Sequence, residues 1–366
     1  MKIFLISNMY PSSDSPGFGV FVKNVADGLR PHGVDTVRKA VLKGRTVGKW
    51  RKIRKYLKLY ADVARGFFSG YDAIYIHFCN QIIPVLNFLY VFRKPDIIVN
   101  FHGEDLLYPN NSFHKRLGQA TEKFCRRHAT GIVVPSSYYA DIVESRGLID
   151  KSRIIVSPSG GIDRSNFTPK DVSELPEELG DRLHLGYVGR LEEGKGIREF
   201  LTVIRRMAER GVPFKATIVG YGSLMPFTMQ YIGIHGLSDL VTVVPGAPQS
   251  LLGDYYRSFD LLLFLSVRPE ESLGLTGLEA MACGTPVVGS DVGGIASYLS
   301  DKVNGYMIRD IENTDGIVDV IRHYAASGRR ERIDMYNNAL ATSSRYFSDA
   351  VCSRLALDFK RLMANG

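Results

Sequence analysis

The chain has 366 residues, of which 45% are hydrophobic, and its formal net charge is +8. This length favours two domains, and the hydrophobic content is sufficient for two cores. The four cysteines, Cys79, Cys125, Cys283 and Cys352, are scattered without a Cys-x-x-Cys pair, so the sequence supports neither a zinc site nor a redox motif.

The N-terminal stretch MKIFLISNMYP predicts a first strand, because its apolar part is too short for a signal peptide. A turn with two glycines, PGFGV at 16–20, follows it. Gly17 and Gly19 would let backbone N–H groups approach a phosphate or an acceptor. The match to Gly-x-Gly-x-x-Gly is incomplete, so a plain strand-to-helix turn explains these glycines equally well.

The excess positive charge is concentrated in residues 36–61, which contain ten Lys or Arg and no Asp or Glu. A helix with an apolar stripe beside a cationic face suits an anionic membrane surface, and we expect such a contact through residues 38–65. An ordinary amphipathic helix docked on its own domain would show the same pattern. Nucleic acid is the least favoured partner, because no aromatic pattern typical of RNA-binding segments accompanies the charges. The apolar residues at helical spacing are Trp50, Ile53, Leu57, Ala61, Ala64 and Phe68.

Short apolar runs alternate with helical patterns along the chain, as in α/β proteins with parallel sheets. The longest apolar helix candidate, at 82–92, is far short of a membrane span. The predicted strands are residues 2–7, 73–78, 96–101, 131–135, 154–157, 183–188, 214–219, 241–244, 261–265, 286–289 and 306–308.

The segment NFHGED, residues 100–105, ends one of these strands. Ligands of open α/β sheets gather at the carboxyl ends of strands. His102 is therefore a candidate active-site residue, although a lone histidine is more often structural. Glu104 and Asp105 either assist it or cap the next helix.

Residues 163–181, DRSNFTPKDVSELPEELGD, are polar, acidic and without a strand pattern, as expected of a domain boundary. The first strand of the second half then leads into GYVGRLEEGKG at 186–196. Around this turn Arg190 and Lys195 could bind a diphosphate, the arginine through a bidentate fork and the lysine as a point charge. A solvated turn would explain either residue alone.

Glu271 and Glu279 lie on either side of a glycine turn in ESLGLTGLEAMACGTPVVGSDVGG, residues 271–294. A helix-like run begins at Gly274, and its free N–H groups and dipole favour a phosphate. Glu279 lies more than one turn into that helix, where its carboxylate could accept hydrogen bonds from a pair of sugar hydroxyls. Glu271 could reach a second sugar.

In this motif, and in SPSGGIDRSNFTP at 157–169, the chain resembles glycosyltransferase family 4, the retaining nucleotide-sugar transferases. Leu273 departs from the family pattern, which usually has an aromatic residue there. The resemblance implies the GT-B fold, an α/β architecture of two facing Rossmann-like domains with parallel sheets flanked by helices and a cleft between the domains. The first domain would comprise 1–164 and 346–366, and the second 165–345.

The resemblance also implies roles for the candidate residues. The basic pair and the helix start would hold the diphosphate, the glutamate within the helix would bind the ribose, and the remaining glutamate and the histidine would position the transferred sugar. The donor-binding residues would be Gly17, Gly19, Arg190, Lys195, Gly274, Leu275 and Glu279, and the catalytic residues would be His102 and Glu271.

We therefore expect a retaining glycosyltransferase that moves a hexose from a nucleotide diphosphate-sugar to a glycan or lipid-linked acceptor, in cell-surface polysaccharide biosynthesis. No Asp-x-Asp motif is present, and two cationic side chains can stabilise the departing diphosphate, so we expect neither a metal nor another cofactor. The protein would be cytoplasmic, either in solution or peripheral on the inner face of the membrane. A nucleotide-sugar epimerase of the same architecture, or a non-catalytic partner protein at the membrane surface, remains an alternative.

Overall fold

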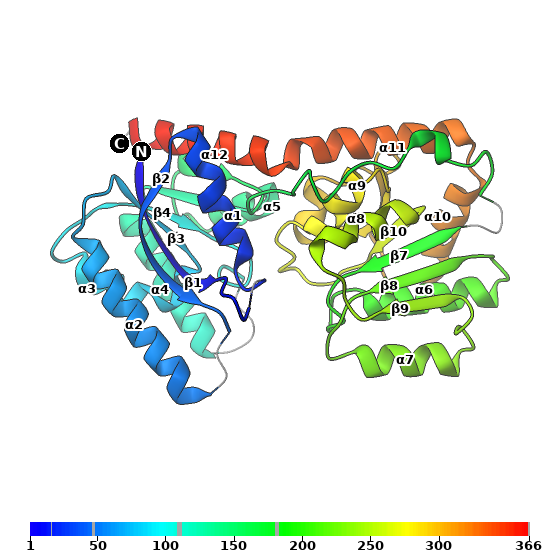
Figure 1. Ribbon diagram of the computed structural model, residues 1–366, viewed down its shortest axis with the longest axis horizontal. Helices are drawn as coiled ribbons and strands as arrows, with labels where there is room; N and C mark the ends of the chain where they lie inside the picture. The colour runs from blue at the N-terminus through cyan, green and yellow to red at the C-terminus, as the bar shows by residue number, and fades with distance from the viewer. Residues whose placement is uncertain (16, 46–47, 108–111, 180–182, 365–366) are drawn as a thin grey trace. The chain divides into compact units, whose positions relative to one another are not determined.

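The computed structural model describes residues 1–15, 17–45, 48–107, 112–179 and 183–364. The chain divides into two compact units (Figure 1), which are an N-terminal unit of Met1–Gly161 with Ser348–Gly366 and a C-terminal unit of Ile162–Phe347. The sequence placed these boundaries at 164/165 and 345/346. Within the described residues no helix is long and apolar enough to cross a membrane.

The N-terminal unit is built on a six-stranded parallel sheet flanked by helices. Its strands are β1 (Lys2–Tyr10), β2 (Asp35–Lys43), β3 (Ala73–His77), β4 (Asp96–Asn100), β5 (Gly131–Val134) and β6 (Ile154–Val156). Its longer helices are α1 (Val20–Leu29), α2 (Lys49–Phe67), α3 (Ile83–Leu89), α4 (Ser112–His128), α5 (Ser137–Ser145) and α12 (Ser348–Ala364). The strand order is β2-β1-β3-β4-β5-β6.

Strand β1 shows why this sheet needs helices on both faces. Successive side chains of a strand point to opposite faces. Phe4 and Ile6 accordingly pack in the core under α2, α3, α4 and α5, whereas Ile3 and Leu5 pack in the core under α1 and α12. Figure 1 shows α12, at the red end of the chain, beside α1, which it contacts.

Strand β2 was not predicted. Its sequence, DTVRKAVLK, lies at the edge of the sheet and pairs only with β1. Of its nine residues only Ala40 and Leu42 are buried. An edge strand with four charged residues has no continuous apolar run. The sequence pattern therefore revealed a basic segment but did not indicate that this segment forms a strand.

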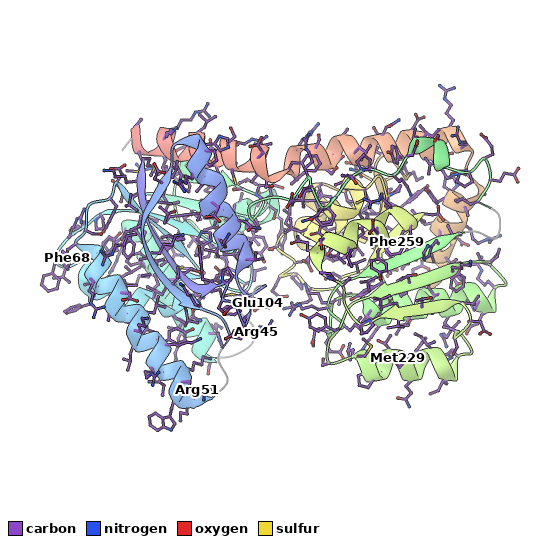
Figure 2. The ribbon with its side chains drawn as sticks, viewed as in Figure 1. Arg45, Arg51, Phe68, Glu104, Met229 and Phe259 are labelled. Carbon is purple, nitrogen blue, oxygen red and sulfur yellow. The ribbon has the colours of Figure 1, made fainter. Side chains whose placement is uncertain are left out.

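Helix α2 docks through a different face from the one that periodicity selected. Leu59, Val63 and Phe67 pack into the core. In the expected stripe, by contrast, Trp50 is 81% exposed and Leu57 is 62% exposed. Figure 2 shows Phe68, 58% exposed, pointing outward just beyond the end of the helix. Helix α2 is therefore docked on its own domain, as the second interpretation expected. Of the stripe residues, however, Ala64 packs against the core, whereas Trp50 and Leu57 are exposed.

The C-terminal unit contains a second six-stranded parallel sheet, with the order β12-β11-β10-β7-β8-β9. Its strands are β7 (His184–Val188), β8 (Lys215–Val219), β9 (Val241–Val244), β10 (Leu261–Phe264), β11 (Val287–Ser290) and β12 (Gly305–Ile308). Its longer helices are α6 (Ile197–Glu209), α7 (Met225–Ile234), α8 (Gln249–Ser258), α9 (Leu275–Ala282), α10 (Thr314–Ala326) and α11 (Arg329–Ser343).

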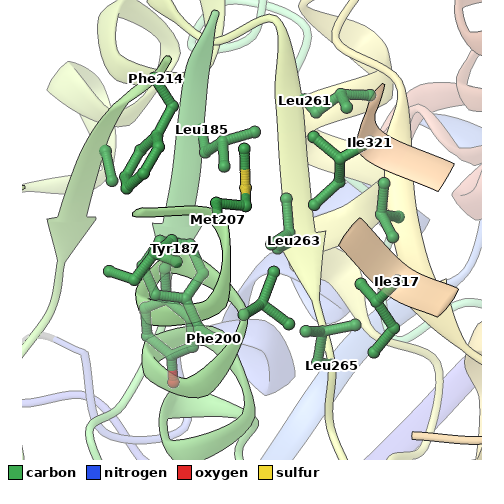
Figure 3. Packing of buried hydrophobic residues seen from close by; sticks show 14 of the residues in the cluster. Leu185, Tyr187, Phe200, Met207, Phe214, Leu261, Leu263, Leu265, Ile317 and Ile321 are labelled. Atoms are coloured by element: carbon green, nitrogen blue, oxygen red, sulfur yellow. The ribbon is translucent and has the colours of Figure 1, made fainter. Parts of the chain in front are cut away.

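Helix α6 illustrates how the sequence builds this unit. Ile197, Phe200 and Ile204 recur at helical spacing on one side and are buried, with charged residues between them. Figure 3 shows Phe200 of this helix packed against the β7 and β10 side chains, with Ile317 and Ile321 of α10 completing the cluster. Each fully buried side chain of this size contributes about 1.5–3 kcal/mol.

Candidate functional site

The predicted phosphate-binding residues lie in loops that follow two neighbouring strands. Arg190 and Lys195 follow β7, and Glu271 and Gly274 follow β10. Strand β7 pairs with β10 on one side and with β8 on the other, so the chain changes direction across the sheet here. Open α/β sheets bind ligands at such a switch point, outside the carboxyl ends of the strands.

The loop between β7 and α6 has a defined shape. The Tyr187 hydroxyl lies 3.0 Å from the carbonyl oxygen of Arg190 and 3.1 Å from that of Lys195, and donates to them. Gly196 caps α6 with a φ of 84°, and a Cβ there would lie 2.5 Å from the backbone carbon of Leu265. Only glycine tolerates this approach. These contacts therefore fix the backbone of the loop that carries Arg190 and Lys195.

Arg190 is exposed and forms no ion pair with any described residue. Lys195 behaves differently. Its Nζ lies 2.7 Å from Oε2 of Glu271, and these two side chains are only 20% and 12% exposed. Ser266 donates to the same oxygen at 3.3 Å. The structure thus brings together two predicted residues from separate motifs and leaves Arg190 available to an anion.

The Lys195–Glu271 pair has chemical consequences for a bound diphosphate. An ammonium group carries three N–H donors, so Lys195 can bind a phosphate oxygen while it keeps its contact with Glu271. The carboxylate in turn fixes the direction of a flexible lysine. Because the pair is mostly buried, removing either partner would leave an uncompensated charge.

Gly274 lies at the start of α9 and is held closely. Its φ is 81°, and a Cβ would lie 2.5 Å from Cε1 of Phe264. Its carbonyl accepts a hydrogen bond of 2.9 Å from the Tyr298 hydroxyl. Leu275 follows as the first residue of the helix and is partly exposed. The first N–H groups of a helix lack intrahelical partners, so this end can receive a phosphate oxygen.

Glu279 is positioned by α8. The Tyr256 hydroxyl donates to its Oε2 at 2.8 Å. Burial raises the pKa of Glu279 to about 7, although hydrogen bonds from Tyr256 and Gln249 act in the opposite direction. Sequence reasoning missed both α8 residues, because neither lies in a motif and only the fold brings α8 next to α9.

In the N-terminal unit, His102 follows β4, and Asp105 fixes its backbone. Oδ1 of Asp105 accepts from the backbone N–H of His102 at 2.8 Å and of Gly103 at 2.9 Å. Burial raises the pKa of Asp105 to about 7. Of the two roles considered for Asp105, the structure shows a local one, in which it holds the loop that carries His102.

A second histidine, His77, lies beside His102 and was missed. Its Nδ1 is 2.9 Å from Nε2 of His102, and the two rings are stacked with centroids 5.1 Å apart. Phe78 stacks on His102 at 4.4 Å. Burial lowers the pKa of His102 to about 3 and lowers that of His77 as well, so both rings are neutral. The sequence did offer a signal for His77. It is a polar residue near the end of the predicted strand 73–78, which became β3, the neighbour of β4.

The two glycines of the N-terminal loop differ. Gly19 caps α1 with a φ of 70°, and a Cβ would lie 2.6 Å from the backbone carbon of Met9. The turn itself therefore requires a glycine at position 19. A Cβ on Gly17 would meet nothing within 4 Å. If a ligand approaches this loop, the open space around Gly17 makes it the better candidate of the two for the contact.

The residues that the structure describes contain no group of three or more His, Cys, Asp or Glu side chains that could hold a metal ion.

Two family models match the chain, one to each unit. The model described as Glycosyl transferases group 1 matches residues 173–341, and the model described as Glycosyltransferase Family 4 matches residues 17–164. The chain belongs to glycosyltransferase family 4. Its α/β fold with two six-stranded parallel sheets is the GT-B fold expected from the resemblance.

Curated relatives of this family 4 chain include two D-inositol 3-phosphate glycosyltransferases. That of Paenarthrobacter aurescens is 33% identical over 187 residues, covering 49% of this chain and 45% of the relative. That of Actinosynnema mirum is 30% identical over 217 residues, covering 56% and 51%. The matched part thus spans about half the length of these relatives.

Solved structures resemble the whole chain at low identity. Anabaena Alr3699/HepE in complex with UDP and glucose has a TM-score of 0.74 at 18% identity, covering 99% of this chain and 100% of the other. Sucrose-phosphate synthase from Thermosynechococcus elongatus has a TM-score of 0.77 at 17% identity, covering 100% of both. At these identities the likeness establishes the fold.

Proposed function

We propose that this protein is a retaining glycosyltransferase that uses a nucleotide diphosphate-sugar as its donor. The observation that carries the proposal is the switch point of the C-terminal sheet. There the exposed guanidinium of Arg190, the directed ammonium of Lys195 and the start of α9 follow adjacent strands. A dianionic diphosphate matches these donors. The similar structures solved with UDP or UDP-glucose support a nucleotide-sugar.

In the proposed reaction the bond between the anomeric carbon and the diphosphate oxygen breaks, and a bond to the acceptor oxygen forms on the same face. The acceptor proton passes to an oxygen of the leaving diphosphate. Negative charge grows on that diphosphate, where Arg190, Lys195 and the α9 dipole stabilise it. Glu279 binds the ribose, and Glu271 and His102 position the sugar. Since two cations neutralise the leaving group, turnover is proposed to need no metal.

The acceptor is proposed to be a glycan or a lipid-linked sugar in cell-surface polysaccharide biosynthesis. The support is the surface of α2, where Trp50, Ile53 and Leu57 are exposed between basic residues. Helix α3, which contacts α2, adds the exposed Phe88 and is followed by the exposed Phe92. Exposed aromatics beside Lys and Arg are typical of helices that lie in a membrane interface. We therefore propose a cytoplasmic protein, peripheral on the inner face of the membrane.

Turnover and stereochemistry can be tested together by NMR. The protein is incubated with a panel of UDP- and GDP-sugars without acceptor, and slow hydrolysis is followed through the anomeric protons. Retention predicts that the sugar first appears as the same anomer as in the donor. The opposite anomer would contradict retention, and a new nucleotide-sugar without free sugar would identify an epimerase.

Membrane association has a separate test. Trp50→Ser/Leu57→Ser should abolish sedimentation with vesicles of phosphatidylcholine and phosphatidylglycerol, without changing the melting temperature, because both side chains are exposed. Ile234→Ser/Leu251→Ser is the matched control, since these apolar residues are exposed in the C-terminal unit. Equal sedimentation of the two double variants would contradict the proposed surface.

A further inference from the structure

A cavity of about 680 Å³ lies between the edge strand β2 and helix α2 in the N-terminal unit. None of the candidate donor-site residues lines it. Its volume falls within the range of pockets that hold small molecules, about 300–1,000 Å³. The lining residues are Tyr10, Lys39, Val41, Leu42, Lys43, Lys55, Lys58, Leu59 and Asp62.

The charge of this lining is almost entirely positive. Four lysines face a single carboxylate, that of Asp62, which pairs with Arg65 at 3.2 Å. Across the described ranges, none of the four lysines forms an ion pair. Like charges gathered around one cavity repel each other. An anion bound between them would relieve that repulsion, which Asp62, itself paired with Arg65, offsets only in part.

Two of the lysines are held by neutral partners. Lys39 donates to the Tyr10 hydroxyl at 3.2 Å, with its Nζ 5.5 Å from the centre of that ring. Lys55 donates to the backbone carbonyl of Lys43 at 2.7 Å. These contacts direct the ammonium groups without neutralising them. Lys43 and Lys58 are exposed at the cavity, so all four can approach a common ligand.

The rest of the lining is apolar, and the cavity adjoins the exposed apolar surface of α2. Val41, Leu42 and Leu59 line it beside the lysines. On the same helix, Leu57 lies next to Lys58 in the chain and is exposed. A ligand that fits must offer negative charge to the lysines and apolar carbon to the helix surface. Phospholipids combine the two in one molecule.

We propose that this cavity binds the phosphate headgroup of an anionic phospholipid and fixes the orientation of the N-terminal unit on the membrane. The inference rests on the proposed membrane association, and it adds a discrete headgroup site to a surface that would otherwise bind by diffuse charge.

Short-chain lipids below their micelle concentration test the site without a membrane. Binding of dihexanoylphosphatidylglycerol to the full-length protein is followed by NMR, with dihexanoylphosphatidylcholine and inorganic phosphate as comparison probes. The site variant is Lys43→Gln/Lys58→Gln. The matched control is Arg51→Gln/Arg54→Gln, which removes the same charge from exposed positions of α2 outside the cavity. Melting temperatures and nucleotide binding establish that both variants are folded.

The proposal predicts saturable binding of the phosphatidylglycerol analogue, weakened by at least about tenfold in the site variant and nearly unchanged in the control. Equal weakening in both variants, or no saturable binding, would show that the surface acts only through diffuse charge. Equal affinity for inorganic phosphate would reassign the cavity to a soluble anion. Vesicle sedimentation reports separately on membrane association, so the site can fail while that association stands.

Discussion

Nδ1 of His77 lies 2.9 Å from Nε2 of His102, and the geometry around them decides which atom carries the proton. Both rings are neutral, so one nitrogen of the pair donates and the other accepts. Nε2 of His77 is buried with no hydrogen-bond partner among the described residues. Orphaned buried N–H groups are rare, so His77 carries its proton on Nδ1. His102 then accepts through Nε2 and carries its own proton on Nδ1, which in the proposed reaction would donate to a substrate oxygen.

Substitutions of His77 should separate donation from packing. His77→Asn retains an N–H donor and should keep most activity. In its ionised form, His77→Asp offers only acceptors, which should move the proton of His102 to Nε2 and lower kcat by at least about tenfold, the equivalent of one hydrogen bond. Nitrogen-15 NMR of labelled histidines reads the tautomer directly. A wild-type His102 protonated on Nε2 would contradict the assignment.

The affinity for nucleotide should depend on the ionisation of Glu279. A carboxylate accepts hydrogen bonds from ribose hydroxyls better than a carboxylic acid does. Because the pKa of Glu279 is raised to about 7, Kd should rise as the pH falls through 7. Glu279→Gln should flatten this profile. Tyr256→Phe removes a hydrogen bond that lowers the pKa and should move the inflection to higher pH. Calorimetric titrations between pH 5.5 and 8.5 would measure it, and a wild-type Kd independent of pH would refute the assignment.

The pair formed by Lys195 and Glu271 should contribute to stability and to turnover in separable ways. Glu271→Ala should abolish turnover and leave the protein folded, with a loss of about 3–5 kcal/mol because a mostly buried ammonium is left unpaired. The double variant Lys195→Met/Glu271→Gln should recover much of that stability and none of the activity. Chemical denaturation and initial rates measure the two effects. Turnover that survives in Glu271→Ala would remove this residue from the site.

Gly17 and Gly19 offer a matched pair in one loop. Gly19→Ala should destabilise the protein by at least about 1 kcal/mol, because the left-handed backbone and the contact with Met9 both oppose a side chain. Gly17→Ala should leave the melting temperature unchanged, since the space around it is open. If substrate approaches this backbone, Gly17→Ala should raise KM. An unchanged KM would assign the loop to the turn alone.

The sequence predicted most of the architecture, because buried parallel strands are continuous apolar runs bounded by turns. It also provided the candidate donor-site residues, as local motifs. It could not show that Lys195 reaches Glu271 or that Tyr256 reaches Glu279, since both contacts depend on how distant strands and helices pack. The loops after β7 and β10 form one candidate site only because these two strands are neighbours in the sheet.

Helix α2 marks the other limit of periodicity. The line through Leu59, Val63 and Phe67 and the line through Trp50, Ile53 and Leu57 are both apolar at helical spacing. A helix with two such lines can dock through either one, and only the packing against the sheet selects between them. Helix α2 packs against β2, and because that charged strand was not predicted, the sequence could not show which line faces the sheet.

The proposed donor site binds the diphosphate of a nucleotide-sugar through Arg190 and Lys195. Its most direct test is a thermal-shift panel of UDP- and GDP-sugars and free nucleotides, with and without EDTA, on the wild type, Arg190→Ala and the control Arg322→Ala on α10. A ligand that binds only the folded state raises the melting temperature. We predict a shift with one diphosphate family that is insensitive to EDTA, retained in Arg322→Ala and lost in Arg190→Ala. A shift that survives in Arg190→Ala, or no shift with any nucleotide, would contradict the site.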